Sequence, residues 1–122
     1  MRNYFFDVSD GKLDIDYTVK PDGDTAAYTL TKLMEYYGIR GTQQARDKRL
    51  AEFFADAVTQ ADQSDTIDFS EYDYVIIFHA GAGEDIGLDN STTNDLSSRF
   101  VSHNLLKTRF GETYQGVPVN AN

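Results

Sequence analysis

The sequence contains no cysteine and no tryptophan, and only two of its 122 residues are proline. Without cysteine, the chain itself forms neither a disulfide nor a thiolate metal site, and it has no cysteine nucleophile. Basic residues are also scarce, because 11 Lys and Arg stand against 20 Asp and Glu, which gives a net charge of -9. Nucleic-acid binders gain affinity by replacing counterions with Lys and Arg. Nucleic acid and anionic membranes are therefore disfavoured as partners.

Long hydrophobic runs are missing as well. The longest, Tyr74–Ala82, is interrupted by His79 and Gly81 and falls far short of the roughly 20 residues that a membrane span requires. We therefore predict no membrane span. The first residues, Met1–Asp7, lack the apolar stretch and cleavage site of a signal peptide. If the protein is exported, we expect its signal upstream of this chain.

What is present suits one globular domain over residues 1–122. The chain has a mass of 13.7 kDa, and most domains have about 100 to 150 residues. Hydrophobic residues make up 40% of it and aromatic residues 13%, which is enough apolar side chain for a core.

Three segments carry the patterns of β-strands. Apolar residues alternate with polar ones over Lys12–Val19, the period-two pattern of a half-buried strand. The Asp10-Gly11 pair before it is a turn signal, so Tyr4–Ser9 is predicted to pair with it as a hairpin. The continuous β-branched and aromatic run Tyr74–Phe78 predicts a central strand buried on both faces.

Other segments carry helical patterns. Thr29–Tyr37 predicts a short helix that ends at Gly38 as its C-cap. The clearest pattern predicts a helix over Gln43–Gln63, whose core face is formed by Leu50, Phe53, Phe54, Ala57, Val58 and Ala61.

The last part of the chain has weaker signals. We predict a strand over Ser98–Ser102, a short helix over His103–Phe110 and a loop over Gly111–Asn122. Helices alternating with strands predict an α/β (α+β) fold, in which helices pack on a mixed sheet.

Three stretches together resemble the immune-inhibitor-A-like zinc metallopeptidases. The first, Phe5–Ile15, resembles the opening motif of that family, an aromatic pair and a Ser-x-Gly-x-Leu-like element before a strand. The second joins Asp68–Asp73 to the predicted strand and to His79–Glu84, and its spacing is the most specific of the three. The third, Asn94–Phe100, resembles a segment that precedes the zinc helix in such peptidases.

The resemblance implies a secreted zinc-dependent endopeptidase that hydrolyses peptide bonds, of which this chain is the N-terminal subdomain of a zincin-like catalytic domain. In that family a His-Glu-x-x-His helix binds zinc, and its Glu acts as general base. The sequence contains no such motif and only two histidines, His79 and His103. We therefore expect the zinc ligands downstream of Asn122, no metal ligand or catalytic residue in this chain, and no activity of this chain alone.

The candidate cleft wall lies at the end of the predicted central strand and consists of His79, Gly81, Gly83 and Glu84. Glycines leave room for a substrate to approach the backbone. The alternative for His79 is a structural role, in which its imidazole bonds to the backbone and holds the glycine turn. His103 is predicted to be an exposed residue of a surface segment.

Calcium is a second candidate cofactor, because acidic side chains supply hard oxygen ligands. Many relatives insert an Asp-rich run after the position of Asp73, whereas here Tyr74 follows at once. The acidic positions that remain do not have EF-hand spacing and equally suit solvated loops: Asp22, Asp24, Glu84, Asp85 and Asp89.

Two other function classes stay open. In a caspase-like or gingipain-like cysteine peptidase, a buried strand also ends in a catalytic His beside Gly, and a later strand supplies the thiolate. In a non-catalytic acidic binding module, the scaffold serves only contacts with other proteins. For the isolated chain we expect exposed apolar surface where the missing C-terminal half packs, and hence dimerisation or a bound companion segment.

Overall fold

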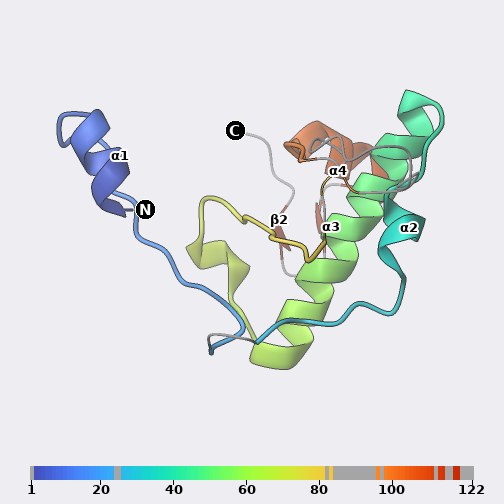
Figure 1. Cartoon of the computed structure of the whole chain (residues 1–122), viewed down its shortest axis with the longest axis horizontal. Coiled ribbons are helices and arrows are strands. Elements are labelled where there is room, and N and C mark those ends of the chain that lie inside the picture. Colours follow the sequence, from blue (N-terminus) through green and yellow to red (C-terminus); the bar gives the residue numbers. More distant parts are fainter. Residues whose placement is uncertain are drawn as a thin grey trace.

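A computed structural model describes residues 2–23, 26–81, 83, 96, 98–111, 113–114 and 117–118 of the chain. In chain order, the elements are α1 (Arg2–Val8), α2 (Met34–Tyr37), α3 (Gln43–Asp65), the 3-10 helix η1 (Phe69–Glu71), α4 (His103–Phe110), β1 (Thr113–Tyr114) and β2 (Val117–Pro118). Figure 1 shows a long central helix with α2 and α4 beside it, whereas α1 lies apart from it.

Helix α3 organises the fold, and the sequence predicted it nearly to its ends. It begins where the Thr42 hydroxyl accepts a hydrogen bond from the backbone N–H of Ala45, which satisfies one of the free donors of the first turn. It ends at Thr66, whose left-handed backbone (φ 52°) closes the last turn. The prediction of a helix over Gln43–Gln63 is confirmed.

Two small hydrophobic clusters pack on α3. In the first, Ala51 of α3 meets Leu106 of α4, and four half-buried residues surround them: Phe54, Val101, Leu105 and Phe110. In the second, Val58 and Ala61 of α3 meet Phe69 of η1, with Tyr28, Phe54, Ile67 and Val75 around them. Alanines on the buried face of α3 let the neighbouring elements come close to its backbone, and Phe54 belongs to both clusters.

The two shorter predicted helices have different outcomes. The helix His103–Phe110 is confirmed as α4, which begins where the Ser102 hydroxyl accepts from the Leu105 N–H. The helix expected over Thr29–Tyr37 is much shorter, because only Met34–Tyr37 is helical.

The predicted α/β mixed sheet is wrong. Helices dominate the described residues, and the one strand pairing found among them joins the two-residue strands β1 and β2 in antiparallel register. These short strands lie inside Gly111–Asn122, which was predicted as a loop. The described residues of Ser98–Ser102 form no strand either.

The hairpin predicted at the N-terminus is wrong as well, because Tyr4–Ser9 lies largely within α1. Asp10 and Gly11 have the left-handed backbone that a hairpin turn requires, with φ of 53° and 73°. The chain uses it to end a helix, since the Gly11 N–H donates to the Phe6 carbonyl at 2.8 Å. A helix C-terminus and a hairpin turn demand the same positive φ, so the signal does not distinguish them.

Two other segments predicted as strands are not strands in the described structure. Lys12–Val19 contains no strand, and Leu13, Tyr17 and Val19 are exposed. Tyr74–Phe78 is not a strand buried on both faces, because Tyr74 and Phe78 are 83% and 84% exposed. Alternation marks which face of a strand is buried, but a strand also needs a neighbour for its backbone.

Among the described residues, no helix is both long and apolar enough to cross a membrane.

The contact between α3 and α4 predicts a sharp size limit at Ala51, whose side chain is fully buried. Ala51→Leu should destabilise the protein by about 1–3 kcal/mol, because a larger side chain pushes Leu106 and α4 away from α3. Urea unfolding followed by circular dichroism at 222 nm measures this.

The matched control is Lys48→Leu, which introduces the same side chain at an exposed position of the same helix. It should change stability by no more than about 0.5 kcal/mol. Equal effects of the two substitutions would contradict the packing described for Ala51.

Candidate functional site

The turn that follows the segment Tyr74–Phe78 is held against α2 and α3. The His79 ring is half-buried and meets the Phe53 ring of α3 edge to face, with 6.3 Å between the ring centroids. Phe53 in turn meets Tyr37 of α2 in the same manner at 5.3 Å. Aromatic rings in this geometry attract each other beyond the area they bury. His79 therefore lies at the end of a row of rings that crosses from α2 to α3.

The His79 imidazole also contacts its own backbone. Its Nδ1 lies 3.2 Å from the Ala80 carbonyl oxygen, and because a carbonyl only accepts, Nδ1 is the donor. This arrangement agrees with the structural alternative stated for His79, an imidazole bonded to backbone at the turn. It leaves Nε2 available on the other side of the ring.

Gly81 has a positive φ of 103°, a backbone conformation that side chains disfavour. A Cβ built at Gly81 would lie 3.1 Å from the methyl group of Met34 in α2. Another residue at this position would have a strained backbone and would require the Met34 methyl group to move slightly. Of the other predicted wall residues, Gly83 is half-buried, and Glu84 lies outside the described residues.

The second histidine differs from its prediction. His103 was expected to be exposed, but it is half-buried as the first residue of α4. Its Nε2 is buried, and no described residue forms a hydrogen bond with it. The prediction failed because the sequence near His103 does not show that α4 packs against α3.

A metal ion does not fit the described residues. They contain no group of three or more His, Asp or Glu side chains that could hold one. Of the acidic residues considered for calcium, Asp22 is exposed and pairs with Lys20, whose Nζ is 2.7 Å from a carboxylate oxygen. The remaining four lie outside the described residues: Asp24, Glu84, Asp85 and Asp89.

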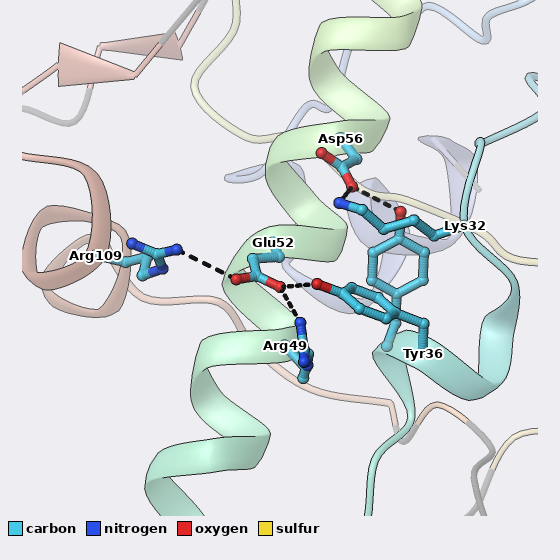
Figure 2. A network of polar contacts seen from close by, with 7 residues as sticks. Lys32, Tyr36, Arg49, Glu52, Asp56 and Arg109 are labelled. Atoms are coloured by element: carbon cyan, nitrogen blue, oxygen red, sulfur yellow. Dashed lines mark hydrogen bonds and ion pairs between the residues drawn. The ribbon is translucent and has the colours of Figure 1, made fainter.

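A cluster of charged and aromatic side chains joins α2, α3 and α4, and the sequence analysis did not identify it (Figure 2). We call it the Glu52 network; its members are Lys32, Tyr36, Tyr37, Arg49, Glu52, Asp56 and Arg109. Arg49 and Glu52 are three residues apart on α3, a spacing that the sequence does show. The partners from α2 and α4 are distant in sequence and carry no pattern of their own.

Glu52 is the centre of this network, and its side chain is only 12% exposed. One carboxylate oxygen accepts from Arg49 at 2.7 Å and from the Tyr36 hydroxyl at 3.1 Å. The other accepts from Arg109 of α4 at 3.2 Å. Figure 2 shows these donors on opposite sides of the carboxylate. Burial alone would raise the pKa of Glu52, but the hydrogen bonds from Arg49, Arg109 and Tyr36 outweigh it and lower the pKa below its ordinary value.

Asp56 extends the network by one helical turn. It accepts from the Lys32 ammonium and from the Tyr37 hydroxyl, each at 2.7 Å. Burial, followed by the bond to Asp56, raises the pKa of the Tyr37 hydroxyl above its ordinary value. The Arg49 guanidinium stacks on the Tyr36 ring at 3.8 Å from its centroid.

These shifts oppose a catalytic role for the network. A general base works best with a pKa near the working pH, whereas Glu52 is held below its ordinary value and Tyr37 above it. The carboxylates are also occupied by donors. The network therefore holds three helices together. It also supports the turn at His79, because Tyr37 of the network contacts Phe53, which contacts His79.

Comparison of the chain with protein-family models, with curated proteins and with solved structures found no match. The resemblance to the zinc metallopeptidases rests on the three sequence stretches alone.

The lowered pKa of Glu52 predicts that this residue contributes to stability in a pH-dependent manner. Glu52→Gln should cost about 1–2 kcal/mol at pH 7, because the charged acceptor of three donors is lost. A lowered pKa in the folded protein means that this contribution is complete above the ordinary value of 4.5 and disappears as the pH falls through the folded pKa. Urea unfolding of both proteins between pH 7 and pH 3 measures the difference, which should shrink below pH 4.5.

Glu35→Gln is the control, since Glu35 is exposed on α2 and its substitution removes the same charge. It should shift stability by less than about 0.5 kcal/mol at any pH. A Glu52→Gln difference that grows on acidification would refute the role given to this carboxylate.

Proposed function

We propose that this chain is a non-catalytic scaffold portion of a secreted zinc-dependent endopeptidase, in which it forms part of the wall of the substrate cleft. The observation that carries the proposal is the turn His79–Gly81. It is fixed on α2 and α3 through Phe53 and Met34, and the residues that lead into it expose large apolar side chains. A cleft wall needs both, a rigid base and an accessible surface.

The zinc assignment comes from the resemblance of Phe5–Ile15, Asp68–Glu84 and Asn94–Phe100 to the metallopeptidase family, and so does the extracellular location. The ligands of the ion are then supplied by other polypeptide, since the described residues offer no group that fits one. Peptides or proteins are the substrates of the complete enzyme. The exposed apolar surface is covered either by the rest of the peptidase or by self-association.

The purified chain tests the non-catalytic part of the proposal. With added Zn²⁺ it should retain no stoichiometric metal in native mass spectrometry and should not cleave denatured casein, because it lacks a ligand set. Stoichiometric zinc together with cleavage would overturn the proposal.

The wall itself is tested at Gly81. Gly81→Ala should weaken the binding of casein-derived peptides several-fold, because the added methyl group is strained at this φ and displaces the turn from Met34. Gly111→Ala is the matched control, since Gly111 also has a positive φ but has no atom within 4 Å of the built Cβ. Fluorescence anisotropy of labelled peptides measures both variants, and equal binding by them would contradict a wall at Gly81.

A second candidate is a non-catalytic, acidic protein-binding module that is not part of a peptidase. The exposed aromatic side chains outside the turn favour it. Tyr4 and Phe6 of α1 and Tyr17 after it are all exposed, and such residues are common in protein interfaces.

The coding sequence beyond Asn122 separates the candidates. A His-Glu-x-x-His motif within roughly a hundred residues supports the zinc peptidase. A cysteine after a hydrophobic strand supports the cysteine peptidases instead. A sequence with neither of these two features supports the binding module.

A further inference from the structure

The segment from Tyr74 to His79 presents two different faces. Tyr74, Ile76 and Phe78 are 83%, 69% and 84% exposed, whereas the residues between them, Val75 and Ile77, and the following His79 are half-buried. The half-buried face is anchored, since Val75 packs on the cluster of Val58 and Phe69, and His79 meets Phe53. The exposed face therefore consists of one aliphatic and two aromatic side chains in alternation.

The backbone of this segment is unpaired within the part of the chain that the structure describes. No helix or strand includes Tyr74–His79, and no backbone hydrogen bond joins it to another described segment. An anchored segment whose side chains alternate between two faces, and whose N–H and C=O groups bond to no other described segment, is a template for pairing with another strand.

We propose that the segment Asp73–His79 pairs with the same segment of a second copy of this chain, antiparallel and about a two-fold axis at Ile76. In this register Tyr74 lies opposite the Phe78 of the second copy, and Ile76 lies opposite its own counterpart. The sequence order of aromatic, aliphatic and aromatic residues is symmetric about Ile76, and a two-fold interface requires such self-complementarity. Aromatic pairs directly opposite each other across two strands are stabilising.

The charges at the ends of the segment fit the same register. Asp73 lies opposite the His79 of the second copy, and the reverse pair forms at the other end. Both ends of the pairing thus place the Asp73 carboxylate opposite an imidazole and not opposite a second carboxylate. A parallel arrangement would place Asp73 opposite Asp73.

The size of the contact indicates a weak dimer. Each aromatic side chain buries about 150–250 Å² when fully covered, but neighbours on one face of two paired strands cover each other only in part, so the six side chains of the two copies bury on the order of several hundred Å². Stable interfaces bury about 1,200–2,000 Å². The net charge of -9 on each copy also opposes association. We therefore expect dissociation in the micromolar range. The inference goes beyond the scaffold role and does not depend on the zinc assignment, because it concerns two copies of this chain only.

The absence of cysteine gives a direct test. Ile76→Cys places two thiols next to each other across the two-fold axis, where Cα atoms of facing residues are about 4.5–5.5 Å apart and a disulfide fits. Mild oxidation should convert most of this variant to a covalent dimer on a non-reducing gel. Leu33→Cys is the control, because Leu33 is equally exposed at 71% but lies before α2; it should cross-link several-fold more slowly. Equal rates would overturn the proposal.

A pair of like or opposite charges tests the register by sedimentation velocity. His79→Asp should weaken the dimer about tenfold, because the new carboxylate lies opposite Asp73 of the second copy. The double variant Asp73→Lys with His79→Asp places an ammonium opposite that carboxylate and should restore the affinity, and both variants lose the same contact with Phe53. Circular dichroism confirms that the variants remain folded. A wild-type chain that stays monomeric at several hundred micromolar concentration, or a double variant that is weaker than His79→Asp, would refute the proposal.

Discussion

The arrangement of the helices depends on the hydrogen bonds that the Glu52 carboxylate accepts. It lies on the long helix α3 and accepts hydrogen bonds from α2 through Tyr36 and from α4 through Arg109. A helix of four residues such as α2 has little stability of its own, because its nucleation is costly. Side-chain contacts to α3 must therefore hold it, and Tyr36 and Tyr37 provide them through Glu52 and Asp56.

From this tie the structure extends outwards to its candidate site. Tyr37 meets Phe53 edge to face, and Phe53 meets His79 in the same way, so the position of the turn after the exposed segment depends on the polar network. In that network the pKa of Glu52 is lowered and the pKa of Tyr37 is raised, which suits a support better than a reacting group. These two side chains are therefore structural, and the exposed residues Tyr74, Ile76 and Phe78 precede the turn that the network supports.

The sequence predicted what depends on one helix face and missed what depends on a neighbour. Apolar spacing and local caps were enough to locate α3 and α4, since a helix satisfies its backbone internally. The alternation at Lys12–Val19 and the apolar run at Tyr74–Phe78 described real patterns, but pairing requires a second segment that the pattern does not name. At Asp10-Gly11 a turn was predicted between two strands, whereas the positive φ of both residues ends helix α1.

The candidate site was predicted in a similar way. His79 and Gly81 were identified from their place after an apolar run, and the structure brings them to one turn against α2 and α3. Glu52 was not identified, because its donors are far away in the sequence: Tyr36 is 16 residues and Arg109 57 residues from it. Long-range polar contacts leave no periodic trace in one sequence.

The ring of Phe54 belongs to both hydrophobic clusters on α3, and this has a consequence for how the protein melts. Loosening of either cluster removes contacts from a side chain that the other one needs, so α3, α4 and η1 lose their order in a single cooperative transition. Helix α1 contributes no residue to the two clusters, and it lies away from α3 in Figure 1. We therefore expect α1 to fray at a lower temperature than that of the main transition.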